Sequence, residues 1–180
     1  MTVAWVFPGQ GSQKIGMAKE IENLPNTKER FSYASEIFER NLFEICELNT
    51  QSTNPLSDLN DTRNTQICLF LVESILLDAL KDNGFKPNFV AGHSLGEYSA
   101  LVAAEALSLK DGLELVSNRA SLMVEHSKAN PTTMAAVIGL EQNKIIEICK
   151  NISKSNSVIE AVNFNSSQQT VIGGHAVSYT

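Results

Sequence analysis

Hydrophobic residues recur along this chain with two spacings, one typical of strands and one typical of helices. Two short runs of strand-forming residues, Val3–Phe7 and Asn88–Gly92, predict buried strands, and the first ends at the turn-forming pair Pro8-Gly9. Helical spacing predicts helices over residues 31–46, 66–83, 95–104 and 108–125. The second of these is apolar on nearly all sides and ends at Gly84, so we expect it at the centre of the core.

The stretches between and after these elements indicate how the chain is divided into domains. Residues 51–65 are polar and predict a surface connection. Ser108 and Asp111 resemble a capping box, which begins a helix whose apolar face comprises Leu109, Leu113, Val116, Ala120 and Met123. Beyond Pro131 the pattern becomes strand, helix, strand, strand, over residues 133–140, 141–151, 158–164 and 170–173. We therefore expect an α/β core over residues 1–130 and the start of a smaller unit over residues 131–180.

Composition narrows the class of protein. The 180 residues hold 14 basic and 20 acidic side chains, for a net charge of −6, without a basic cluster, so nucleic acid is not the expected partner. The longest apolar stretch, residues 67–80, is interrupted by polar side chains and falls short of a membrane span. Three widely spaced cysteines favour reduced, packed thiols over disulfides or a metal site. These features predict a cytoplasmic protein without membrane contact.

The sharpest motif is Gly92-His93-Ser94-Leu95-Gly96, a GxSxG between a predicted strand and a predicted helix. A nucleophile elbow needs this arrangement, because its serine has a strained backbone and the flanking glycines relieve the clash between strand, turn and helix. The following helix directs its first N–H groups towards negative charge that develops beside the serine. The alternative is a glycine-rich turn with an incidental serine.

A nucleophilic serine also needs a base. After Ser94 the histidines are His126 and His175, and neither has the strand-end context of a hydrolase triad. His93 is adjacent to the serine, but we expect it to support the turn. A convincing base is therefore missing from the sequence.

Two further features have a chemical and a structural interpretation. The loop Gly9-Gln10-Gly11-Ser12-Gln13 lacks the Gly-Lys-Ser/Thr of a phosphate loop, so it is either an oxyanion-hole loop or an ordinary tight turn. Arg119 lies at the edge of an apolar helix face. Its position favours a side chain whose stem packs at the edge of the core while the guanidinium extends into solvent. The alternative is a guanidinium that binds a carboxylate through two parallel hydrogen bonds.

Together the motifs resemble one family over essentially all 180 residues. The order and spacing of the segments at residues 7–13, 65–66, 92–97, 134–140 and 162–166, together with Arg119, are similar to those of malonyl-CoA:acyl carrier protein transacylases. The resemblance implies a hydrolase-like parallel-sheet core with an inserted ferredoxin-like subdomain that begins near Pro131.

The resemblance also implies an activity and a set of residues. Ser94 would take a malonyl group from malonyl-CoA as an ester and pass it to the pantetheine thiol of acyl carrier protein, in fatty acid biosynthesis and without a cofactor or metal. The backbone N–H groups of Gln10 and Leu95 would form the oxyanion hole, and Arg119 would bind the malonyl carboxylate. His93 and Gln66 correspond to residues that shape the pocket.

The sequence departs from the family pattern in three places. The histidine that activates the serine in the family would lie beyond residue 180, so we expect an incomplete N-terminal part that transfers malonyl poorly. Ile67 and Val124 stand where proline and glutamine are usual. Other interpretations stay open: an acyltransferase module of a polyketide-type synthase, a truncated product with little catalysis, or a serine hydrolase or thioesterase.

Overall fold

The computed structural model describes residues 2–47 and 54–175 and divides the chain into two compact units, Met1–Val124 and Glu125–Thr180. The division falls within the helix α5 (Leu109–Ala129), whereas the sequence pattern changes at Pro131. The assignment of residues 1–130 and 131–180 as domains stays a prediction, and each unit is described by itself.

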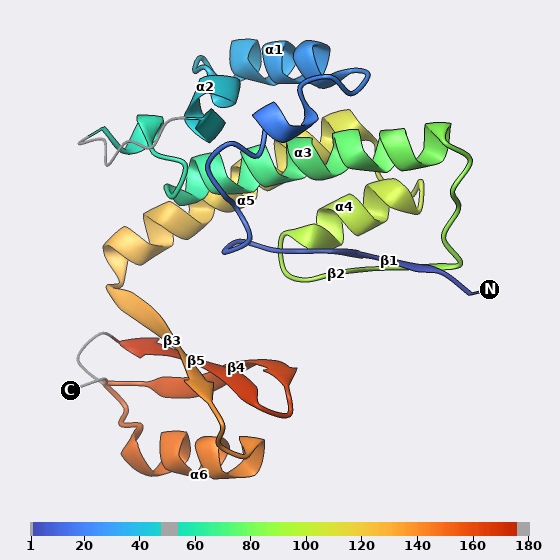
Figure 1. Cartoon of the computed structure of the whole chain (residues 1–180). Coiled ribbons are helices and arrows are strands. Elements are labelled where there is room, and N and C mark those ends of the chain that lie inside the picture. The colour runs from blue at the N-terminus through green and yellow to red at the C-terminus, as the bar shows by residue number, and fades with distance from the viewer. Residues whose placement is uncertain (1, 48–53, 176–180) are drawn as a thin grey trace. The chain divides into compact units, whose positions relative to one another are not determined.

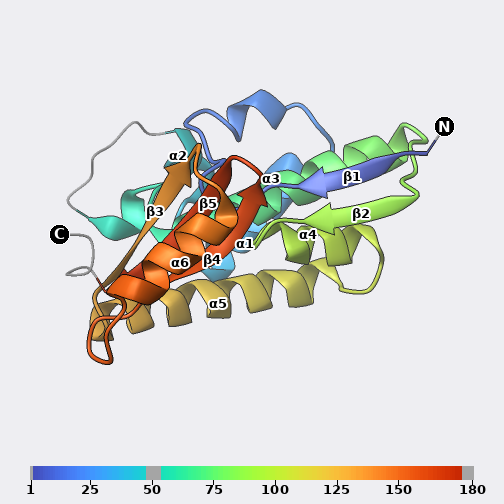
Figure 2. The same cartoon turned by 90° about the horizontal axis from the view of Figure 1, so that it is seen from below.

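The first unit contains a parallel two-stranded sheet made from the two predicted strands. β1 (Ala4–Phe7) pairs with β2 (Phe89–Gly92) in the register Ala4 to Phe89 (Figures 1 and 2). The helix α4 (Gly96–Ala103) covers one face of the sheet, where Phe7 packs with Ala100 and Ala103. The carboxyl ends of both strands therefore lie together, and each is followed by one of the two glycine-rich motifs. The predicted α/β class with a parallel sheet is confirmed.

The helix α3 (Thr62–Asp82) is the centre of the first unit, as its all-round apolar sequence predicts. Every residue from Asn64 to Ile75 is buried. In Figure 1, α3 lies between α4 and the pair α1 (Thr27–Ile37) and α2 (Leu42–Glu47), whose apolar side chains share its core. Two short 3₁₀ turns, Lys19–Ile21 and Pro55–Ser57, complete the connections among the described residues.

Three expectations about this unit are wrong. The two strands are not buried as predicted, since Val6 is 72% exposed and Phe89 is 66% exposed. The helix predicted over residues 31–46 is two helices, because the chain turns after Ile37 and Glu39 adopts a φ of 52°. The polar stretch 51–65 is only partly a surface connection: residues 51–53 lie outside the described residues, and α3 already begins at Thr62. Asn64 and Thr65 are fully buried because their side chains satisfy backbone carbonyls, including that of Leu59 at 2.5 Å from the Thr65 hydroxyl.

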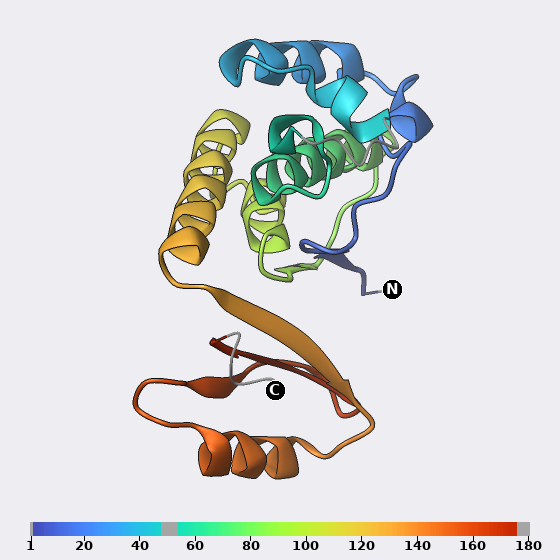
Figure 3. The same ribbon diagram turned by 90° about the vertical axis from the view of Figure 1, so that its left-hand side faces the viewer.

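The second unit has the predicted order of strand, helix, strand and strand. β3 (Thr132–Ile138), α6 (Gln142–Ile152), β4 (Ile159–Ser166) and β5 (Gln169–His175) form an antiparallel sheet in the order β3-β5-β4. α6 covers one face (Figure 3), and Ile145, Cys149 and Ile159 form the core between helix and sheet. β5 lies between β3 and β4 and is antiparallel to both, which is the split β-α-β arrangement of ferredoxin-like units.

Two other predictions concern the chain as a whole. Cys46, Cys68 and Cys149 are all free and buried, as expected for packed thiols. None of the helices in residues 2–47 and 54–175 is long and apolar enough to cross a membrane.

Candidate active site

Ser94 lies on a sharp turn between β2 and α4, and its side chain is exposed. Its φ of 55° is in the left-handed region, which costs a non-glycine residue energy and is typical of a nucleophile elbow. The two glycines of the motif make the turn sterically feasible. A Cβ on Gly92 would lie 2.1 Å from the carbonyl group of Gly96, and a Cβ on Gly96 would lie 2.2 Å from the Phe7 carbonyl oxygen.

The loop after β1 packs directly against this elbow. A Cβ on Gly9 would lie 2.5 Å from the His93 carbonyl oxygen and 3.0 Å from His93 Nδ1, so only glycine allows the two backbones to approach this closely. Within the described residues, no protein acceptor is hydrogen-bonded to the backbone N–H of Gln10 or Leu95. The two predicted oxyanion donors thus belong to adjoining segments, one of which contains Ser94, and their role stays a prediction.

The structure brings Arg119 to the serine. Arg119 lies on α5 and is half-buried, and its Nη2 donates to Ser94 Oγ at 2.8 Å. Its Nη1 donates to Gln66 Oε1 at 2.6 Å, and its guanidinium carbon lies 6.0 Å from the centre of the Tyr98 ring. In the described part of the chain no carboxylate forms an ion pair with Arg119. A cation that forms no ion pair within the described residues therefore lies against the candidate nucleophile.

Gln66 connects Arg119 to the loop after β1. Its side chain is fully buried on α3, and its Nε2 donates to Met123 Sδ at 3.2 Å and approaches Gln10 Oε1 at 3.4 Å. Met123, the last residue of the predicted apolar face of α5, has a side chain that is 42% exposed. Its sulfur instead contacts the site. Helical spacing places Met123 one turn after Arg119, but no sequence signal distinguishes such a contact from ordinary packing.

No hydrogen bond among the described residues joins Ser94 Oγ to a histidine. Of the three histidines, His93 belongs to the first unit, and its backbone lies against Gly9. His126 and His175 belong to the second unit, where the His175 ring nitrogen Nδ1 accepts from the Val158 N–H at 3.0 Å. Arg119 is the hydrogen-bond partner of Ser94 Oγ among the described residues. Residues 2–47 and 54–175 contain no cluster of metal-ligating side chains.

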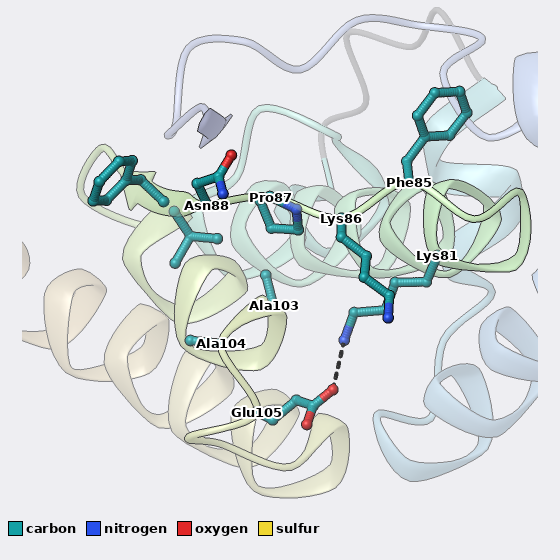
Figure 4. A pocket seen from close by; sticks show the side chains of 10 residues that line it. Lys81, Phe85, Lys86, Pro87, Asn88, Ala103, Ala104 and Glu105 are labelled. Atoms are coloured by element: carbon teal, nitrogen blue, oxygen red, sulfur yellow. Dashed lines mark hydrogen bonds and ion pairs between the residues drawn. The ribbon is translucent and has the colours of Figure 1, made fainter. Parts of the chain in front are cut away.

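A groove of about 460 Å³ lies at the other end of the parallel sheet. Figure 4 shows its lining at the C-terminal ends of α3 and α4 and the start of β2, where Lys81 forms an ion pair with Glu105 at 3.3 Å. Ligands of parallel α/β sheets bind outside the carboxyl ends of the strands. Ser94 follows the carboxyl end of β2, and this groove lies at its amino end, so the groove is not part of the candidate active site.

Comparison with known proteins decides the family. The family model of the acyl transferase domain matches residues 4–178. The chain belongs to the acyl transferase family. Acyl transferases similar to it include the malonyl CoA-acyl carrier protein transacylases of Staphylococcus aureus, 42% identical over 96% of this chain and 54% of theirs, and of Synechocystis, 40% identical over 97% of this chain and 55% of theirs. The chain therefore spans about half the length of the curated relatives it matches.

Solved acyl transferase structures have the same fold. The malonyl CoA-acyl carrier protein transacylase of Coxiella burnetii superposes with a TM-score of 0.88 at 37% identity, and the alignment covers 99% of this chain and 55% of that one. A complex of a malonyl-transacylase with its type II PKS acyl-carrier protein superposes with a TM-score of 0.87 at 33% identity, over 99% and 57% of the two chains. The resemblance inferred from the motifs is confirmed.

Proposed function

We propose that this chain carries the nucleophile of a malonyl-CoA:acyl carrier protein transacylase and takes part in fatty acid biosynthesis. The observation that supports the proposal most strongly is the guanidinium of Arg119, which has no protein carboxylate partner among the described residues and lies 2.8 Å from Ser94 Oγ. Malonyl-CoA differs from most acyl-CoA molecules in its second, free carboxylate. A planar guanidinium binds such a group through two parallel hydrogen bonds.

In the first half of the reaction, Ser94 Oγ attacks the thioester carbonyl carbon of malonyl-CoA. An Oγ–C bond forms, negative charge develops on the carbonyl oxygen, and the backbone N–H groups of Gln10 and Leu95 donate to that oxygen. The C–S bond then breaks, and coenzyme A leaves as a thiol with the proton from the serine. Arg119 retains the malonyl carboxylate, so the acyl group stays in place as a seryl ester.

In the second half, the pantetheine thiol of acyl carrier protein attacks the ester and regenerates Ser94. The proposed carrier partner follows from the family and from the structural neighbour whose name describes a complex with a carrier protein. The carrier in that complex is a type II PKS acyl-carrier protein, and a polyketide-type carrier is accordingly the second candidate acceptor. The chemistry at Ser94 is the same for both.

Proton transfer is expected to limit the rate of this chain. The hydroxyl of a serine is a poor nucleophile without a base, and a positioned base contributes about 10²–10⁴-fold. Ser94 Oγ bonds to a cation in the structure, and none of the hydrogen bonds among the described residues joins it to a histidine. We therefore expect slow acylation that free imidazole, supplied as an exogenous base, accelerates.

The proposal is tested by intact-mass measurement after incubation with malonyl-CoA, with and without imidazole. We expect the mass of one malonyl group on the wild-type chain and none on Ser94→Ala. Ser12→Ala is the matched control, since the Ser12 hydroxyl bonds to the Gly9 carbonyl within the same region and is not the proposed nucleophile. A malonyl ester that persists in Ser94→Ala would contradict the proposal.

We also propose that the protein acts in the cytoplasm, where fatty acid precursors and reduced thiols occur together. All three cysteines are buried and free. The pKa of the Cys46 thiol is raised mainly by a hydrogen bond with Cys68 and to a smaller extent by burial. The thiol therefore stays protonated. Such thiols are typical of reducing compartments.

A further inference from the structure

The loop after β1 is attached by its side chains to the beginning of α3. Gln10 Nε2 donates to the Thr62 hydroxyl at 3.2 Å, and Gln13 Nε2 donates to Asn60 Oδ1 at 3.1 Å. Gln10 itself is exposed, so it gains no rigidity from burial. The packing of Gly9 on His93 fixes the start of the loop, and hydrogen bonds of this kind orient the Gln10 backbone N–H that follows.

The carboxamide of Gln10 lies between two side chains on one face of α3. Its Nε2 donates to Thr62, and its Oε1 lies 3.4 Å from Nε2 of Gln66, four residues further along the helix. Residues at this spacing are neighbours on a helix surface. Of these two contacts, the one to Thr62 is shorter and the better hydrogen bond.

The Thr62 end of this contact is firmly held. Thr62 is the first residue of α3, and the preceding Asp61 caps the helix by accepting from the Arg63 N–H at 3.0 Å. The side chain of Arg63 also donates to both carboxylate oxygens of Asp61, at 2.8 and 2.7 Å, and it holds the pKa of that carboxyl below its ordinary value. The acceptor for Gln10 thus belongs to a rigid, capped helix terminus.

We infer that Thr62 is a positioning residue for the oxyanion hole, an inference that rests on the proposed function. Its hydroxyl fixes the Gln10 side chain, and through it the Gln10 backbone N–H that donates to the reacting carbonyl oxygen. Thr62 touches no reacting atom. Its effect should appear in the rate of ester formation at saturating malonyl-CoA and leave the apparent KM unchanged. None of the hydrogen bonds among the described residues joins Thr62 to Arg119, which binds the carboxylate.

Thr62→Val removes the hydroxyl and keeps the shape of the side chain, and Thr62→Ser keeps the hydroxyl. Complete loss of one oxyanion donor costs about 10²–10³-fold in rate, so loosening one should cost less, about five- to twentyfold. We expect this loss at saturating malonyl-CoA in Thr62→Val, measured by mass with imidazole present, and a rate near wild type in Thr62→Ser. Equal rates for the valine variant and the wild type would overturn the inference.

Hydrogen exchange tests the same inference without chemistry at Ser94. The Gly11 N–H donates to Gln13 Oε1 at 2.7 Å, and the Ser12 N–H donates to the Gly9 carbonyl at 3.2 Å. Both amides should exchange about three- to tenfold faster in Thr62→Val than in Thr62→Ser. Unchanged exchange would overturn the inference even if the rate fell. If no variant is acylated, the proposed function fails, and exchange alone then decides whether Thr62 holds the loop.

Discussion

Arg119 shows how neighbours decide the role of a single residue. At the edge of an apolar helix face its sequence position favours a side chain that extends into solvent. In the structure one guanidinium nitrogen donates to Gln66 and another to Ser94, and the charge has no carboxylate partner among the described residues. The contact with buried Gln66 limits the rotation of the guanidinium, so it is oriented before a substrate carboxylate arrives.

Arg119→Ala should reduce malonyl loading of Ser94 far more than acetyl loading. A charge-assisted bidentate contact is worth about 1.5–3 kcal/mol, which corresponds to roughly ten- to a hundredfold in kcat/KM. The control Arg119→Lys keeps the charge but not the two parallel N–H donors. Its malonyl loading should lie between those of the wild type and Arg119→Ala. Loading is measured by mass with malonyl-CoA and acetyl-CoA in parallel, and equal losses for both substrates would mean that Arg119 does not select the carboxylate.

At the scale of elements, the site depends on how closely β1, β2 and α4 approach one another. Gly92 and Gly96 let the helix begin directly beside the strands, and Gly9 lets the first loop lie on His93. This packing brings the Gln10 and Leu95 amides to the same end of the sheet. Gly9 and Gly92, where the two motifs begin, are 83 residues apart in the chain, and the parallel pairing of β1 with β2 brings the motifs together.

Gly96→Ala should therefore destabilise the unit as well as the site. Its Cβ would lie 2.2 Å from the Phe7 carbonyl oxygen and 2.5 Å from that of Pro8, which are backbone atoms that cannot rotate away. Forcing the two segments apart should cost about 2 kcal/mol or more in the free energy of unfolding, measured by urea titration. Glu97→Ala, an exposed position on the same helix, should change it by less than about 0.5 kcal/mol. Equal midpoints for the two variants would contradict this packing argument.

At the scale of the whole molecule, Glu73 makes stability depend on pH. It is 6% exposed on α3, accepts a hydrogen bond from Ser99 on α4, and has one oxygen without a partner among the described residues. Burial raises the pKa of Glu73 from 4.5 to about 7, despite the opposing effect of the Ser99 hydrogen bond. The folded chain therefore binds this proton more tightly than the unfolded chain does.

The stabilisation from Glu73 should be complete below pH 4.5 and lost as the pH rises to about 7. The difference between the two pKa values corresponds to roughly 3 kcal/mol. Urea titrations from pH 4 to 8 should show this decline in the wild type and a flatter profile in Glu73→Gln. Glu114→Gln, at an exposed position on α5, is the control and should keep the wild-type slope. A Glu73→Gln profile parallel to the wild type would contradict the assignment.

The sequence by itself determined most of the elements and the candidate nucleophile. Strand-forming runs, the all-round apolar helix and the glycines around Ser94 are local signals, because each depends on residues within a few positions of one another. Only the tertiary structure decided which side chains meet at Ser94. The contacts of Arg119 with Gln66 and of Gln10 with Thr62 join residues 53 and 52 positions apart, and no periodicity encodes such a distance. The burial of Asn64 and Thr65 escaped prediction for the same reason: polar side chains can enter a core only where the fold supplies their hydrogen-bond partners.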